Sequence, residues 1–108
     1  MKKTIYISIP ITGHDENKQR EKADSIKHML SRQGWHVISP FDVYVGPEPT
    51  YGTYLGADVR IIIDHVDAIF MCKRWQESKG CRVERFVAET YGKEIRFESV
   101  EEPERYWR

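Results

Sequence analysis

The feature that most constrains this chain is a short apolar run followed closely by a helical segment. Residues 68–72 are all apolar, which is typical of a buried strand. Ser78 is a good N-cap residue, and the residues after it recur at helical spacing on one face until a glycine ends the pattern, namely Val83, Val87 and Tyr91. A strand, a short loop and a helix predict an open α/β sheet, in which ligands bind at the carboxyl ends of the strands.

The rest of the chain alternates in the same way between strand-like and helix-like segments. β-Branched and aromatic residues predict strands, and apolar residues three or four positions apart predict helices. The expected strands are residues 4–9, 35–39, 66–71 and 93–97, and the expected helices are residues 15 or 17 to 33, 56–65 and 78–92. This order predicts an α/β fold with a doubly wound parallel sheet of four to five strands and helices on both faces, in three α/β/α layers.

The apolar residues of the first two helices indicate which helix faces are buried. On the first helix we expect Ala23, Ile26, Met29 and Leu30 to face the core, and on the second Val59, Ile62 and Ile63. Between these helices, residues 41–53 are expected to be an irregular loop, since glycine and proline punctuate them. The loop region is aromatic through Tyr44, Tyr51 and Tyr54. These tyrosines suit either a lid over a flat ligand or a surface loop packed onto the domain, and both interpretations stay open.

Composition excludes several classes of function. The chain has 17 basic and 17 acidic residues without clustering, so no net field attracts a nucleic acid polymer or an anionic membrane. No apolar run approaches the ~20 residues of a membrane span and no leader resembles a signal peptide, so we expect a cytoplasmic protein. We expect one domain over residues 1–97 and a charged tail over residues 98–108.

The cysteines and glycines argue against a metal or a cofactor. Cys72 and Cys81 lack the CxxC spacing of a zinc site or a redox motif, and Cys72 is expected in the core. No cluster of histidine, cysteine and acidic residues has ligand spacing, and no GxGxxG follows the first strand. We therefore expect neither metal catalysis nor a dinucleotide cofactor.

Polar residues and glycines follow the ends of the first three expected strands, and we expect them to form one site. The candidates are Ser8, Ile11, Thr12 and Gly13 after the first strand, Asp42 after the second, and Ser78, Gly80 and Glu84 after the third, with Tyr6 in the first strand and Asp58 on the second helix. Hydroxyls and backbone amides at a helix N-terminus suit phosphate, whereas carboxylates suit sugar hydroxyls and an anomeric carbon. The alternative is a capped surface helix with an exposed glutamate.

Four segments resemble, in order, motifs of the nucleoside 2-deoxyribosyltransferase superfamily, and most closely its small branch called DUF4406: residues 6–13, 56–60, 66–69 and 75–84. The resemblance runs from about residue 4 to about residue 97. It implies a flavodoxin-like homodimer or higher homo-oligomer that needs no cofactor. It also implies cleavage of the N-glycosidic bond of a 2'-deoxynucleoside or its 5'-monophosphate, by hydrolysis or by transfer to a second base.

The resemblance also assigns roles to three residues. Glu84 matches the family nucleophile, which attacks C1' and forms a covalent glycosyl-enzyme. Tyr6 matches the tyrosine that orients the nucleophile, and Asp58 matches an aspartate near the sugar hydroxyls and the leaving base. We expect Glu84 to be solvent-accessible, with its charge stabilised by the helix N-terminus.

Position 78 separates the branches that this chain resembles. Transferases of free nucleosides carry an acid six residues before the nucleophile, whereas the related 5'-monophosphate N-hydrolases carry a serine that binds phosphate. Ser78 therefore favours a 5'-monophosphate as substrate. Arg82 replaces a residue that is usually small in the hydrolases, and it either blocks the pocket or contacts phosphate. Arg82 thus favours the alternative function, a non-catalytic module that binds a nucleotide or nucleotide-sugar.

Overall fold

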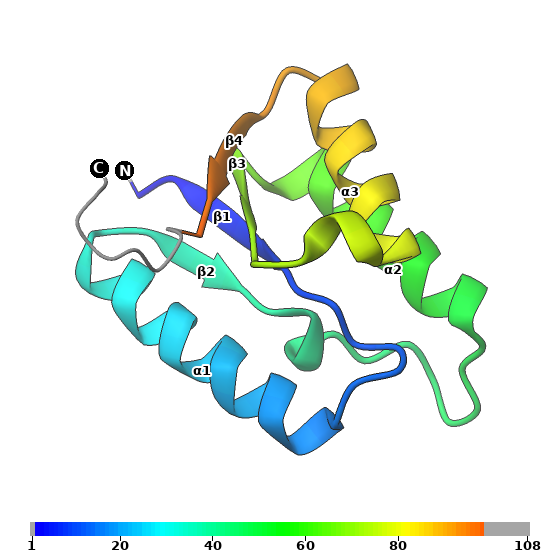
Figure 1. Ribbon diagram of the computed structural model, residues 1–108. Coiled ribbons are helices and arrows are strands. Elements are labelled where there is room, and N and C mark those ends of the chain that lie inside the picture. Colours follow the sequence, from blue (N-terminus) through cyan, green and yellow to red (C-terminus); the bar gives the residue numbers. More distant parts are fainter. Residues whose placement is uncertain (1, 99–108) are drawn as a thin grey trace.

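The computed structural model describes residues 2–98, which form a four-stranded parallel sheet in the order β2-β1-β3-β4. The elements are β1 (Thr4–Ser8), α1 (Glu16–Arg32), β2 (His36–Ile38), the 3-10 helix η1 (Pro40–Asp42), α2 (Tyr51–His65), β3 (Ala68–Met71), the 3-10 helix η2 (Trp75–Glu77), α3 (Lys79–Thr90) and β4 (Glu94–Phe97). Helix α1 covers one face of the sheet, and α2 and α3 cover the other (Figure 1). The predicted doubly wound α/β fold is confirmed.

Strand β1 lies between β2 and β3 and divides the core in two. Its residues alternate between the two faces of the sheet, as the period of a strand requires. Ile5, Ile7 and Ile9 pack in an apolar cluster with α1, which also contains Cys72 as expected. Tyr6 belongs to the second cluster, which lies against α2 and α3. The first cluster is purely apolar, whereas the second adjoins the buried polar residues that form the candidate site.

Helix α2 begins at residue 51, five residues before the expected start. Thr50 and Thr53 form a capping box: the Thr50 hydroxyl accepts from the Thr53 N–H at 3.1 Å, and the Thr53 hydroxyl accepts from the Thr50 N–H at 3.2 Å. Gly52 and Gly56 lie in the first turns and weaken the helical pattern in the sequence. The expected irregular segment over residues 41–53 is therefore wrong at both ends, since η1 also overlaps its start.

The buried faces of the helices differ from expectation in several places. Met29 is 41% exposed, and Val59 and Ile63 are only half-buried. Of the expected apolar face of α3, Val87 packs against the second cluster, whereas Val83 and Tyr91, the residue after the helix, are exposed. The buried residues of α3 are Cys81, Glu84 and Ala88. The buried stripe of α3 contains a carboxylate, so a search for apolar periodicity selects the wrong face.

Two further expectations concern the ends of the chain and membranes. Of the expected tail 98–108, only Glu98 is among the described residues, where its carboxylate accepts from the Lys73 N–H at 2.7 Å. No helix within residues 2–98 combines the length and apolarity that crossing a bilayer requires.

Candidate functional site

The centre of the candidate site is the Glu84 carboxylate, which two hydroxyls from β1 hold in place. The Ser8 hydroxyl donates to Glu84 Oε1 at 2.7 Å, and the Tyr6 hydroxyl donates to Glu84 Oε2 at 3.2 Å. Tyr6 and Ser8 are fully buried and Glu84 is 6% exposed. The expectation of a solvent-accessible Glu84 is therefore wrong. Two donated hydrogen bonds fix the orientation of the carboxylate and stabilise its ionised form.

The residue spacings of a strand and of a helix bring these three residues together. Tyr6 and Ser8 are two positions apart on a strand, so both side chains point to the α3 face of the sheet. Ser78 begins α3, where its hydroxyl accepts from the Cys81 N–H at 3.2 Å. Glu84 then lies in the second turn, on the stripe that faces the sheet. Its side chain consequently meets the end of β1.

A second carboxylate, Asp58, belongs to the same buried group. It lies on α2, which packs against α3, and it is 8% exposed. Its Oδ1 atom is buried and has no hydrogen-bond partner among residues 2–98. A buried carboxylate oxygen without a partner is costly, and such groups occur mainly where a ligand or a proton completes them.

Burial raises the pKa of both acids. The pKa of Glu84 is raised to about 8, first by burial and then by the nearby Asp58 charge, although the Ser8 and Tyr6 hydroxyls lower it in part. Burial raises the pKa of Asp58 to about 6, against the lowering effect of Tyr6 and Glu84. The pKa of Tyr6 also lies well above its ordinary value, because of burial and then the two carboxylates. Burial therefore opposes ionisation of both acids at once, and the pair tends to retain a proton near neutral pH.

This result corrects the expectation that the helix N-terminus stabilises the charge of Glu84. A helix dipole acts mainly within its first turn, and Glu84 lies beyond that turn. Desolvation dominates instead, as expected for a carboxyl group removed from water.

A cavity of about 530 Å³ opens above the acid pair. Ligand pockets for small molecules commonly have about 300–1,000 Å³, so this cavity has room for a nucleotide. Much of its wall is apolar or aromatic, and polar side chains from α1, α2 and the start of α3 complete it. The lining residues are Ile9, Ile11, Thr12, Glu16, Arg20, Pro40, Phe41, Val43, Tyr51, Tyr54, Leu55, Asp58, Glu77, Ser78, Lys79, Gly80, Cys81 and Glu84.

The sequence profile described as "Domain of unknown function (DUF4406)" matches residues 3–97. The chain belongs to the DUF4406 family. A solved structure titled "2-desoxiribosyltransferase from Leishmania mexicana" superposes with a TM-score of 0.68 at 19% identity, over 88% of this chain and 63% of that chain. At this identity the likeness concerns the fold, and the DUF4406 chain spans less than two thirds of that protein. No curated protein sequence matches the chain.

The structure brings most of the predicted site residues of the DUF4406 domain to the cavity. Ile11, Thr12, Ser78 and Gly80 line it together with Asp58 and Glu84, and Tyr6 and Ser8 contact Glu84 from below. Gly80 serves a close contact within the protein: a Cβ atom there would lie 3.1 Å from the Tyr51 hydroxyl. The start of α2 therefore closes over the start of α3.

Three predicted residues of the DUF4406 domain neither line the cavity nor contact Glu84. Gly13 is exposed at a turn, with a φ of 84° that favours glycine. Asp42 accepts from the Ser39 N–H within η1 and pairs with Lys27 at 2.7 Å. Arg82 is exposed, and its guanidinium donates to the Gln76 carbonyl at 2.7 Å. Arg82 thus neither narrows the cavity nor faces it.

Other lining residues of the DUF4406 domain were not expected at the site. Glu16 and Arg20 line it from the first two turns of α1, Phe41 from η1, and Lys79 from the start of α3. The i,i+4 spacing of Glu16 and Arg20 indicates a surface ion pair but not its proximity to a cavity. Tyr51 and Tyr54 line the cavity as the lid interpretation expects, whereas Tyr44 does not. Within residues 2–98 no group of three or more acidic, histidine or cysteine side chains has the geometry to hold a metal ion.

Proposed function

We propose that this DUF4406 protein cleaves the N-glycosidic bond of a 2'-deoxynucleoside 5'-monophosphate, with Glu84 as the nucleophile. The observation that carries the proposal is the buried Glu84 carboxylate at the base of a nucleotide-sized cavity, held by hydrogen bonds from Tyr6 and Ser8. A carboxylate held in a single orientation suits attack on an anomeric carbon. The acceptor of the sugar is water or a second base.

The two acids divide the chemistry between them. A Glu84 oxygen forms a bond to C1' while the bond from C1' to the base nitrogen breaks, and the electron pair of that bond leaves with the base. The positive charge that develops on the sugar favours ionised Glu84, so the proton of the acid pair moves to Asp58 and from there to the leaving base. Water or a second base then attacks C1' and releases Glu84, and Asp58 accepts the proton of the attacking group. The raised pKa of Asp58 suits such proton exchange near neutral pH.

The start of α3 supports a phosphate group on the substrate. The Ser78 hydroxyl accepts from the Cys81 N–H, so its own proton is left to donate to an anion. Lys79 lines the cavity beside it and has no ion-pair partner among residues 2–98. A hydroxyl, an unpaired ammonium and the positive end of a helix favour a 5'-phosphate at this end of the cavity.

The test is incubation of the protein with the four deoxynucleoside 5'-monophosphates, with free base followed by chromatography. We expect base release by the wild-type protein and none by Glu84→Gln, which preserves the shape of the side chain. Adding a different free base distinguishes the two acceptors, because transfer yields a new nucleotide and hydrolysis yields only sugar phosphate. Equal release by both proteins would contradict the role of Glu84.

A non-catalytic nucleotide-binding module is the second candidate, and one observation favours it. Burial raises the pKa of Glu84, which disfavours its ionised, nucleophilic form near neutral pH. Arg82 no longer favours this candidate, since it faces away from the cavity. Tight binding of a nucleotide without base release at any pH between 5 and 9 would support the binding module.

We further propose that the protein is a homo-oligomer, as the resemblance implies. Helix α3 carries an exposed apolar stripe that suits a subunit interface: Val83, Phe86 and Tyr91. Light scattering tests this, with Phe86→Glu expected to lower the measured mass. A wild-type protein that stays monomeric at high concentration would contradict it.

A further inference from the structure

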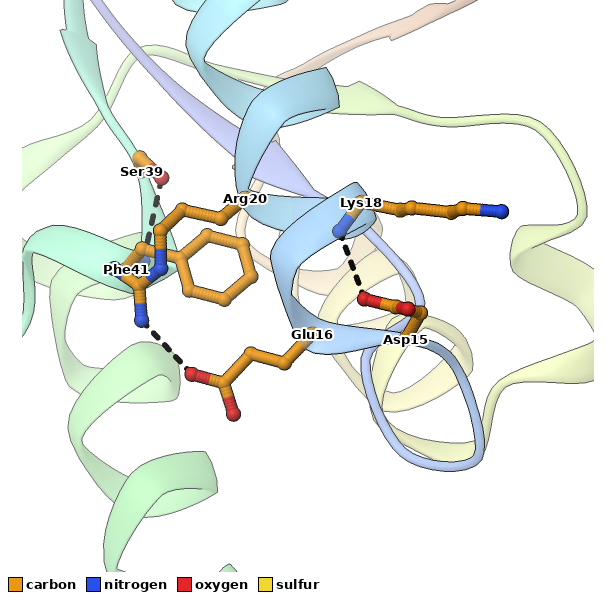
Figure 2. Close-up of polar contacts among 6 residues, drawn as sticks. All are labelled: Asp15, Glu16, Lys18, Arg20, Ser39 and Phe41. Atoms are coloured by element: carbon orange, nitrogen blue, oxygen red, sulfur yellow. Dashed lines mark hydrogen bonds and ion pairs between the residues drawn. The ribbon is translucent and has the colours of Figure 1, made fainter.

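The end of the cavity opposite α3 carries an arginine stacked on an aromatic ring. The Arg20 guanidinium lies over the Phe41 ring, 4.6 Å from the ring centroid. Its Nη2 atom donates to Glu16 Oε2 at 2.8 Å. Figure 2 shows the three side chains gathered between α1 and η1. All three line the cavity, so this stack, formed by Glu16, Arg20 and Phe41, is part of the ligand-accessible wall.

Local hydrogen bonds hold the stack from both sides. Asp15 caps α1 by accepting from the Lys18 N–H at 3.1 Å, which fixes the first turn that carries Glu16 (Figure 2). On the other side the Ser39 hydroxyl accepts from the Phe41 N–H at 3.2 Å and fixes η1 (Figure 2). These bonds fix the backbone on both sides of the stack, while the Arg20 and Glu16 side chains stay exposed enough to meet a ligand.

The charge distribution of the cavity separates its two ends. Arg20 is already paired with Glu16, so this end carries little net charge and is a poor seat for phosphate. Lys79 at the other end has no ion-pair partner among the described residues, and it lies next to the Ser78 hydroxyl. The acid pair of Asp58 and Glu84 lines the same cavity. A nucleotide bound with its phosphate at α3 and its sugar at the acids directs its base to α1.

We propose that the Arg20–Phe41 stack is the binding site of the nucleobase, and that Arg20 determines how tightly the base binds. This inference rests on the proposed function, because it assumes a nucleotide in the cavity. Planar guanidinium groups and aromatic rings are the surfaces on which proteins stack nucleobases. Glu16 contributes by holding the plane of the guanidinium against the ring. Purines have the larger face, so they should depend on the stack more than pyrimidines.

Calorimetric binding to the whole protein tests the proposal, with two probes. The first is the set of four deoxynucleoside 5'-monophosphates, measured with Glu84→Gln in place to prevent turnover. The second is 2-deoxyribose 5-phosphate, which has the sugar and the phosphate but no base. We expect Arg20→Ala to raise the Kd of the purine nucleotides about tenfold, within the ~1–3 kcal/mol that stacking of one base contributes. The Kd of 2-deoxyribose 5-phosphate should change less than about twofold.

Matched variants separate stacking from charge and from general surface effects. Arg20→Lys keeps the charge but loses the plane, so it should weaken nucleotide binding nearly as much as Arg20→Ala. Glu16→Gln should weaken it less. Lys79→Ala should weaken the binding of the nucleotides and of 2-deoxyribose 5-phosphate equally. Arg32→Ala, an exposed arginine at the other end of α1, should change neither.

Several outcomes would overturn the proposed base-binding site. Equal weakening of both probes by Arg20→Ala, together with recovery in Arg20→Lys, would make Arg20 a phosphate ligand. A nucleotide Kd that is unchanged in Arg20→Ala would also overturn the proposal. So would the absence of binding for all four nucleotides. Nucleotide binding that depends on Arg20, without base release by the wild-type protein, would leave the proposed base-binding site standing and contradict only the proposed catalysis.

Discussion

Strand β1 presents two different surfaces to the two sides of the sheet. Toward α1 it places Ile5, Ile7 and Ile9 among aliphatic and aromatic side chains. Toward α3 it places Tyr6 and Ser8, whose hydroxyls hold a buried carboxylate. Burial stabilises the first side through the hydrophobic effect. On the second side the same burial raises the free energy of an ionisable group, and hydrogen bonds offset only part of that cost.

One face of β1 thus contributes mainly to stability, and the opposite face contributes to the candidate site. A buried carboxyl group is tolerated on the α3 side because two hydroxyl donors and a ligand cavity surround it. On the α1 side Ile5, Ile7 and Ile9 pack among apolar side chains. Each of the following changes tests this contrast, beginning with the largest expected effect.

A charge on the α1 side should prevent folding. Ile7→Asp places a carboxylate in a fully buried apolar cluster, without the paired hydroxyls that hold Glu84. We expect a loss of at least about 4 kcal/mol, which is close to the whole stability of a small domain. Circular dichroism during thermal unfolding measures this. Ile7→Val is the control and should cost less than about 1.5 kcal/mol; a folded Ile7→Asp protein would contradict the contrast.

Removal of the carboxyl group on the α3 side should abolish activity and leave the fold intact. Glu84→Gln retains the shape of the side chain but cannot form the glycosyl bond. We expect base release to fall by at least about 10³-fold. The measurement is initial rates of base release under saturating nucleotide. Loss of folding in this variant would show that the carboxylate is a structural group.

The same variant should change how stability depends on pH. The pKa of Glu84 is raised in the folded state to about 8, so its contribution to stability is complete below its unfolded pKa and is lost as pH rises toward 8. Wild-type stability should therefore fall between about pH 5 and pH 8. Glu84→Gln should lose at least about 1.4 kcal/mol less over this range, the equivalent of one pKa unit. Denaturant unfolding at several pH values measures the difference; parallel curves would contradict the raised pKa.

Loss of one donor should have an intermediate effect on activity. Ser8→Ala removes the 2.7 Å hydrogen bond to Glu84, which raises the pKa of Glu84 further and reduces its ionised fraction. We expect base release at neutral pH to fall about tenfold and the acidic limb of the pH–rate profile to move to higher pH. Tyr6→Phe removes the longer bond, at 3.2 Å, and should move the limb less. A lower rate with an unmoved limb would contradict this electrostatic role for Ser8.

The smallest effect is expected at Arg82. Its side chain is exposed and bonds only a carbonyl at the start of the helix. Arg82→Ala should change stability by no more than about 0.5 kcal/mol and should leave base release unchanged. A large loss of activity would mean that Arg82 turns into the cavity when substrate binds, as the original expectation of a phosphate contact requires.

The sequence predicted the fold more completely than the site. Short β-branched runs separated by helical segments specify a parallel α/β sheet, and the structure confirms their order. The start of α2 was missed because Gly52 and Gly56 dilute the helical pattern, while the capping box that starts the helix depends on two threonines. The buried face of α3 was missed because periodicity assigns burial to apolar residues and exposure to glutamate.

Site residues could be predicted from the sequence only where they lie within the motifs that resemble the superfamily. Glu84 meets hydroxyls 76 and 78 residues away in the sequence, so its burial cannot be deduced from its neighbours. The family motifs nevertheless include both ends of these contacts. No motif links Arg20 to Phe41, because their contact depends on how α1 packs beside η1. The lid and surface-loop interpretations of the tyrosines could not be separated without knowing where the cavity lies.

The most direct test of the central claim is mass spectrometry of the protein quenched during reaction with a deoxynucleoside 5'-monophosphate. If Glu84 is the nucleophile, the intact wild-type protein gains the mass of one deoxyribosyl 5-phosphate group, that is, deoxyribose 5-phosphate less one water. Fragmentation then assigns this group to the peptide that contains Glu84. Glu84→Gln should show no gain and no base release. Base release by Glu84→Gln at the wild-type rate, or an adduct on any other residue, would contradict the account.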